Sequence, residues 1–122
     1  MYTNDVFNFI NTDRYSGALE KGITFVANCY VYQECSNLPD NLTGYLPRLE
    51  VKPTFASEEI ILECTIDNDR AELQAGRGII NFIVSAEDTL DLPVGMFTYE
   101  ITIKSLDDLV FRLSYGKFQI VA

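Results

Sequence analysis

The amino-acid sequence predicts an all-β fold, an antiparallel β-sandwich of seven to nine strands with one short helical turn. Short runs of β-branched and aromatic residues alternate between apolar and polar side chains with a period of two, as in strands that bury one face. Gly, Pro, Asn and Asp separate these runs at close spacing and favour turns. The 122 residues suit one domain, so we expect residues 1–122 to form a single sandwich with 1–22 as an N-terminal strand or arm.

Individual strands follow from this alternation. The run 24–33 has one small apolar face and one amphipathic face, which suits a strand near the middle of a sheet. The run 45–52 contains Pro47, which cannot donate to a ladder, so we expect an edge strand there. An edge strand at 6–10 should dock on the sheet or on a neighbour, and 14–22 should form a loop. Further strands are expected at 60–66, 70–73, 79–84, 96–105, 109–115 and 118–121, with Gly116 separating the last two.

The helical turn is expected over 85–92. Ser85 can accept a hydrogen bond from the amide of Asp88 and so cap the start of the helix. The loop at Asp107-Asp108 lacks glycine, so we expect a wider turn than a two-residue type I′.

Charge and composition exclude several functions. The chain has 9 Lys and Arg against 18 Asp and Glu, a net charge of -9, which argues against binding to nucleic acid or to anionic membranes. It has no histidine, which excludes Ser-His-Asp and Cys-His sites and histidine metal ligands. We therefore expect a protein that is not an enzyme, with no catalytic residue, no metal site and no cofactor.

The cysteines and acidic pairs favour structural roles. Cys29, Cys35 and Cys64 are an odd number of thiols with no C-x-x-C spacing, and the first residues lack the basic and apolar stretches of a secretory signal. We expect reduced thiols and a cytoplasmic assembly history. Asp67-Asn68-Asp69 could offer oxygen ligands to calcium, but it lacks the spacing of a calcium loop, so a plain turn is favoured.

Apolar side chains at outward positions predict a docking face. Most aromatic side chains of a sandwich belong to the core, but tyrosine is also enriched at protein interfaces. Arg48 and Arg112 are candidates for ion pairs across sheets or subunits. The predicted interface residues are Val6, Phe7, Phe9, Val26, Tyr30 and Tyr32.

Two stretches together resemble a known family. Asn41-Leu42-Thr43-Gly44-Tyr45 leads into one strand, and Ser85-Ala86-Glu87-Asp88-Thr89 precedes Leu92-Pro93-Val94-Gly95. With Val110-Phe111-Arg112-Leu113 and Gly116, this pattern resembles the immunoglobulin-like modules of bacteriophage virion proteins, such as the N-terminal domain of baseplate upper proteins. The likeness covers about 22–121 and departs from the family's pattern at Asn41, where an Asp is usual.

The resemblance implies an immunoglobulin-like sandwich and a structural role in a phage virion, in the tail, baseplate or neck. It implies assembly in the host cytoplasm, with other phage structural proteins or further copies of the chain as partners. It brings no catalytic motif. The alternative function is a carbohydrate- or receptor-binding module, disfavoured by the absence of tryptophan.

Overall fold

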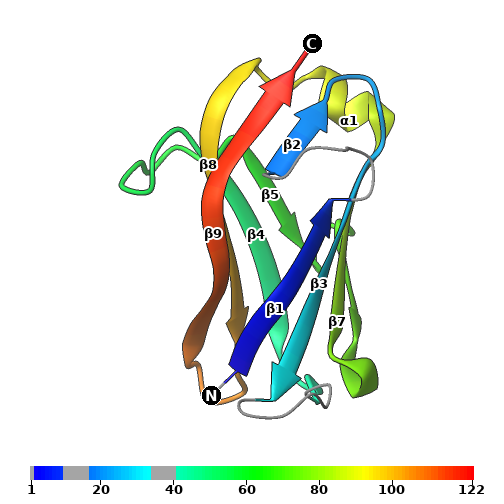
Figure 1. Cartoon of the computed structure of the whole chain (residues 1–122), viewed down its shortest axis with the longest axis vertical. Helices are drawn as coiled ribbons and strands as arrows, with labels where there is room; N and C mark the ends of the chain where they lie inside the picture. Colours follow the sequence, from blue (N-terminus) through cyan, green and yellow to red (C-terminus); the bar gives the residue numbers. More distant parts are fainter. Residues whose placement is uncertain (1, 10–16, 34–40) are drawn as a thin grey trace.

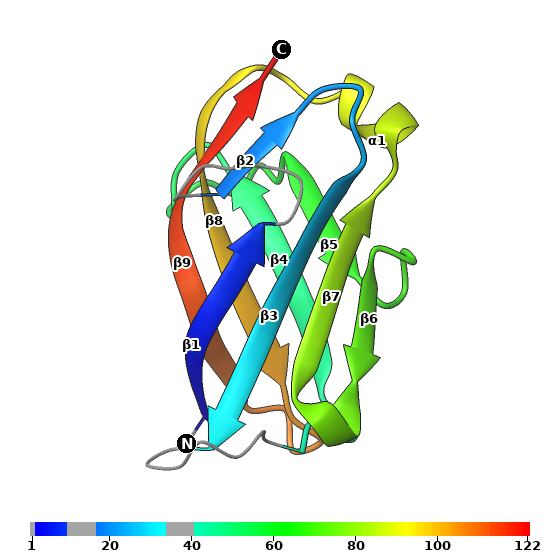
Figure 2. The same ribbon diagram turned by 45° about the vertical axis from the view of Figure 1, so that its right-hand side comes forward.

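The structure is a computed structural model that describes residues 2–9, 17–33 and 41–122, with side chains for 18–31 and 41–122. The nine strands of these residues form two sheets that pack face to face (Figures 1 and 2). Sheet A has the order β1-β3-β7-β6, and sheet B has the order β2-β9-β8-β4-β5. The fold class predicted from the alternation is therefore confirmed.

The strands of sheet A are β1 (Tyr2–Phe9), β3 (Phe25–Gln33), β7 (Ile79–Val84) and β6 (Ala71–Gln74). Those of sheet B are β2 (Gly17–Glu20), β9 (Val110–Val121), β8 (Gly95–Lys104), β4 (Leu46–Lys52) and β5 (Leu62–Thr65). Immunoglobulin-like sandwiches pair strands A-B-E-D in one sheet and C-F-G in the other. The strands β1-β3-β7-β6 facing β4-β8-β9 have this order.

Two short helical segments complete the described chain. The helix α1 (Ala86–Leu90) begins as expected, because Ser85 accepts a hydrogen bond from the Asp88 amide at 3.2 Å. A 3-10 turn, η1 (Ala75–Arg77), joins β6 to β7. In the described residues, no helix is long and apolar enough to span a bilayer.

The N-terminal region differs in part from expectation. The edge strand β1 docks on sheet A by antiparallel pairing with β3, as predicted. Part of the expected loop is instead the strand β2, which pairs in parallel with the end of β9. Each sheet therefore gains one strand from the N-terminal region, and residues 14–16 of the expected loop and residue 10 of the expected edge strand lie outside the described residues.

The prediction that β4 is an edge strand is wrong. β4 lies between β8 and β5. Proline is tolerated because β5 pairs only with Arg48 to Val51, so Pro47 lies beyond the end of β5 and needs no partner on that side.

The C-terminal hairpin contains a bulge that reverses which residues face the core. Ile103 pairs with Phe111 and Ile101 with Ser114, so β9 holds one extra residue, Leu113. The strand does not end at Gly116 as expected and instead continues to Val121. One bulged strand therefore replaces the two strands predicted at 109–115 and 118–121.

Gly116 has a packing role within this continuous strand. A Cβ atom there would lie 3.2 Å from Cε1 of Tyr99, so the glycine makes room for the tyrosine ring. The Tyr99 hydroxyl shares a 2.9 Å hydrogen bond with that of Ser114.

The core lies between the inner faces of the two sheets. Phe25 from sheet A and Phe118 from sheet B are fully buried and meet edge to face, with ring centroids 5.6 Å apart. Full burial of one such side chain stabilises the folded state by about 1.5–3 kcal/mol. The expected wide turn also forms, since the Ser105 amide donates to the Leu109 carbonyl at 2.8 Å and Asp108 adopts a positive φ of 63°.

Candidate functional site

The cysteine side chains that the structure describes belong to the core. Cys29 points inward from sheet A and Cys64 from sheet B, and both are fully buried. Burial raises the pKa of each thiol to about 12, so neither is a thiolate nucleophile at neutral pH. Cys35 lies outside the described residues. Among residues 2–9, 17–33 and 41–122, no group of three or more Cys, Asp or Glu side chains is arranged to hold a metal ion.

The turn Asp67-Asn68-Asp69, considered above as a calcium site, instead holds Asn68 in hydrogen bonds to the backbone. Asn68 accepts from the amide of Thr65 at 2.9 Å through Oδ1 and donates to the carbonyl of Glu63 at 2.8 Å through Nδ2. These backbone groups belong to β5, the edge strand of sheet B. The side-chain amide thus takes the place of a neighbouring strand and blocks this edge against pairing with another chain.

The outer face of sheet A is a candidate contact surface. We use this name for the outward side chains of its two central strands, which are Val26, Asn28, Tyr30, Ile79, Asn81 and Ile83. None of the six is charged. Ile83 is 48% exposed, although it lies in the strand of the most continuous apolar run of the chain.

An amide ladder crosses this face. Gln74 on β6 donates through Nε2 to Oδ1 of Asn81 on β7 at 2.9 Å, and Asn81 donates through Nδ2 to Oδ1 of Asn28 on β3 at 2.6 Å. The register places Asn8 of β1 opposite Asn28. Neutral side-chain amides therefore follow one line across β6, β7 and β3.

The predicted interface residues lie on sheet A. Val26 and Tyr30 are half-buried on its outer face, and the register places Val6 opposite Tyr30. Phe7 and Phe9 lie opposite Cys29 and Ala27, which are core residues, and Tyr32 lies opposite Thr3. The side chains of Val6, Phe7, Phe9 and Tyr32 lie outside the description, so their role as interface residues stays a prediction.

The outer face of sheet B is charged instead. We use this name for the outward side chains of β4, β5, β8 and β9. Arg48 on β4 pairs through Nη2 with Glu63 on β5 at 2.5 Å and with Glu50 at 3.1 Å. Arg112 on β9 pairs with Glu100 on β8 at 2.5 Å. Both arginines thus form ion pairs, but these lie within one sheet and not across the two sheets.

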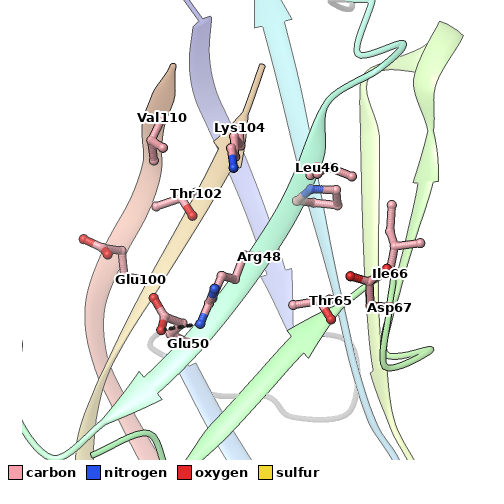
Figure 3. A pocket seen from close by; sticks show the side chains of 11 residues that line it. Leu46, Arg48, Glu50, Thr65, Ile66, Asp67, Glu100, Thr102, Lys104 and Val110 are labelled. Carbon is pink, nitrogen blue, oxygen red and sulfur yellow. Dashed lines mark hydrogen bonds and ion pairs between the residues drawn. The ribbon is translucent and has the colours of Figure 1, made fainter. Parts of the chain in front are cut away.

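A shallow cleft of about 400 Å³ opens on this face (Figure 3). Arg48 and Glu50 lie in its middle, joined by their ion pair, and Leu46, Lys104 and Val110 lie toward one end. The full lining consists of Leu46, Pro47, Arg48, Glu50, Thr65, Ile66, Asp67, Glu100, Thr102, Lys104 and Val110.

Two aromatic rings are exposed beside the charged rows. Tyr115 on β9 is 60% exposed and Phe55, in the loop after β4, is 47% exposed. Their ring centroids are 5.9 Å apart with an interplanar angle of 79°, and the guanidinium carbon of Arg112 lies 5.0 Å from the Tyr115 ring centroid. Lys52 and Lys117 flank Thr98 in the neighbouring row of the sheet.

Sequence reasoning did not identify the amide ladder or the aromatic pair. The signal for the ladder was an asparagine at an outward position in the middle of two apolar strands, at Asn28 and Asn81. Phe55 gave no such signal, because it lies in a loop where alternation says nothing. Neither contact follows from spacing, since Asn28 and Asn81 are 53 residues apart.

The sequence matches no family model, and a search of curated proteins finds no match. Among solved structures, the chain is similar to CopC from Methylosinus trichosporium OB3b, with a TM-score of 0.50 and 10% identity over 99% of this chain and 94% of that one. It also aligns with the PmoD soluble domain from Methylocystis sp. ATCC 49242 (Rockwell), with a TM-score of 0.49 and 7% identity over 93% and 86%. At this identity the match to CopC indicates a shared fold and nothing further.

These comparisons overturn the phage assignment. CopC, a solved structure that the chain resembles over nearly its whole length, is not a phage virion module. The predicted family, the role in a tail, baseplate or neck, and the location in a virion assembled in a host cytoplasm are therefore wrong. CopC is not by its name a carbohydrate- or receptor-binding module, so the alternative gains no support either.

The error has a physical reason. The quoted motifs are turn and core signals, and each has a local task in this fold. Ser85 caps α1, Thr89 accepts from the amide of Gly22 at 3.0 Å, and Gly95 takes a φ of 154° at the start of β8. Any sandwich with the same turns selects such residues, so they specify architecture and not family.

Proposed function

We propose that this chain is a non-enzymatic protein-interaction module that associates with a second copy of itself through the outer face of sheet A. The observation that carries the proposal is the lack of charge on that face in a chain of net charge -9. The proposal includes no nucleic-acid or membrane partner. The inert core thiols support a role without covalent catalysis, because their protonated forms dominate at neutral pH.

Electrostatics favour this face for self-association. Two copies of an acidic chain repel each other, and the repulsion is strongest where charged surfaces meet with water excluded. The six side chains of the outer face of sheet A bring no charge into such a contact. Its charged neighbour on β6 is Glu72, which lies at the sheet edge and can remain in water.

The amide ladder suits a two-fold contact. A side-chain amide both donates and accepts, so an amide of one copy can pair with the same amide of the other. A two-fold interface requires such a self-complementary surface. Val26, Tyr30 and Ile83 around the ladder supply apolar area whose burial favours association.

The test is molar mass in solution by light scattering after gel filtration at two or more concentrations. We expect a dimer for the natural chain and a monomer for Ile83→Lys, which places a charge within the contact, beside Val26. Met96→Lys is the matched control, because Met96 lies on β8 of sheet B and is 59% exposed. A natural chain that stays monomeric, or an Ile83→Lys variant that stays dimeric, would sink the proposal.

A further inference from the structure

The outer face of sheet B has a charge opposite to that of the rest of the chain. It holds five of the nine basic residues and three of the eighteen acidic ones, a local net charge of +2. The other 4 basic and 15 acidic residues give the remainder -11. The basic residues of this face are Arg48, Lys52, Lys104, Arg112 and Lys117.

The two arginines of this face form ion pairs with glutamates of the same face, whereas two of its lysines form no ion pair with a described residue. Arg48 and Arg112 pair with the three glutamates of the face, and Lys104 lies 3.3 Å from Asp108. Lys52 and Lys117 form no ion pair with any residue that the structure describes. They lie in one row of the sheet, on either side of Thr98.

The two exposed aromatic rings adjoin this lysine row. Tyr115 precedes Lys117 by two positions on β9, so both project from the same face. Phe55 reaches Tyr115 from the loop after β4, which projects beside β8 and β9 (Figure 1). Tyrosine and arginine are enriched at energetically important contacts, and Arg112 stacks on this tyrosine.

We propose that Lys52, Lys117 and the Phe55–Tyr115 pair bind an acidic segment of a partner polypeptide that carries an aromatic or aliphatic side chain. The lysines would receive its carboxylates, and the two rings would cover its apolar side chain. A short acidic segment fits within the positive face, whereas an extended polyanion such as nucleic acid would pass onto a remainder of charge -11. The site is separate from the outer face of sheet A.

The experiment is an amide NMR titration of the isotope-labelled full chain with a synthetic peptide of alternating Glu and Asp around one central Phe. We expect shifts centred on Lys52, Tyr115 and Lys117. The double variant Lys52→Glu/Lys117→Glu should weaken binding at least tenfold, and Tyr115→Ala about fivefold. Spectra of the unliganded variants check that each is folded.

A matched control separates the site from overall charge. Lys21→Glu/Arg77→Glu makes the same charge change away from the site and should alter the affinity by less than about twofold. Equal weakening by both double variants would show an effect of net charge only and would overturn the proposal.

Three other results would also overturn it. The first is that a thymidine oligonucleotide binds at the same amides more tightly than the acidic peptide does. The second is that a peptide with Lys in place of every acidic residue binds as tightly as the acidic peptide. The third is that the chemical shifts of these amides change with protein concentration alone. The last would assign the face to a second copy. Light scattering of Lys52→Glu/Lys117→Glu keeps the two proposals distinguishable, because a dimer through sheet A should persist in that variant.

Discussion

The two sheets of this protein have similar inner faces and dissimilar outer faces. The outer face of sheet A is uncharged on β3 and β7 and is crossed by neutral amides. The outer face of sheet B is crossed by ion pairs of Arg48 and Arg112 and is flanked by lysines. Both are sheet surfaces with half-buried positions, so strand geometry does not explain the difference. It indicates that the two faces meet different surroundings, which is the basis of both proposals.

The inner faces show how little the fold distinguishes the two sheets. Phe82 of sheet A and Phe118 of sheet B are each fully buried, and so are the thiols of Cys29 and Cys64. Burial raises the pKa of each thiol to about 12. The two sheets therefore contribute buried side chains of the same kinds to the core.

The largest expected effect is the loss of stability on truncating a core phenylalanine, and it tests whether the two sheets contribute equally to the core. Phe82→Ala and Phe118→Ala should each lower the free energy of unfolding by about 3–5 kcal/mol, through lost burial and the cavity that remains. Equilibrium urea unfolding measures both values. If a variant fails to fold, the Leu substitutions at the same positions give the comparison at smaller cost. Values that differ by more than about 2 kcal/mol would show that one sheet dominates the core.

An intermediate effect is expected at alkaline pH. The native state holds both thiol protons more tightly than the unfolded state, whose thiols titrate near pH 9.0. The stabilisation is therefore complete below pH 9 and is lost as the pH rises toward 12, by up to about 1.4 kcal/mol per pH unit for each thiol. Urea unfolding between pH 8 and pH 11 measures this slope.

Single substitutions show how much each sheet contributes to this pH dependence of the free energy of unfolding. Cys29→Ala and Cys64→Ala should each remove the same share, and the double variant should remove both. The raised pKa of Tyr99, which is caused mainly by its burial, adds a contribution that these variants leave in place. A double variant with the slope of the natural chain would contradict the assignment to the thiols.

The smallest expected effect separates the outer faces by salt. Asn81→Ala removes two side-chain hydrogen bonds from the ladder of sheet A and should cost about 1 kcal/mol at any salt concentration. Arg48→Ala removes the ion pairs of a partly exposed side chain on sheet B and should cost about 1 kcal/mol or less. That cost should shrink in 1 M NaCl, where exposed charges are screened.

Thermal or urea unfolding of both variants at low and high salt gives the comparison. Equal salt dependence for the two variants would mean that the faces do not differ electrostatically in the way their contacts indicate. Thr102→Ala, beside Arg48 in the register but outside its ion pairs, serves as a control for the loss of a polar side chain on sheet B.

Much of the fold could be predicted from local pattern. Ser85 caps the helix where expected, the loop at Asp108 is wide as expected, and all nine predicted strand segments contain strand residues, the last two within the single strand β9. The bulge at Leu113 was not predictable, because two apolar runs out of phase with a glycine between them also fit two separate strands. The internal position of β4 was missed because Pro47 lies beyond its partner's end, a fact of strand length rather than composition.

The candidate sites were less predictable than the fold. Val26 and Tyr30 were placed on an outward face correctly, since alternation alone assigns faces. Their neighbours on that face, Ile79 and Asn81, were not predicted, because they come from a strand about fifty residues further along the chain. Phe55 entered a site only because its loop folds back onto Tyr115.

The sequence by itself determined which residues form strands, which side of each strand is apolar, and the net charge of the chain. Only the tertiary structure decided which strands are neighbours. It thereby brought Asn28 to Asn81, Arg48 to Glu63 and Phe55 to Tyr115. The physical reason is that alternation is a local property of consecutive residues, whereas strand pairing depends on how two sheets close over one shared core.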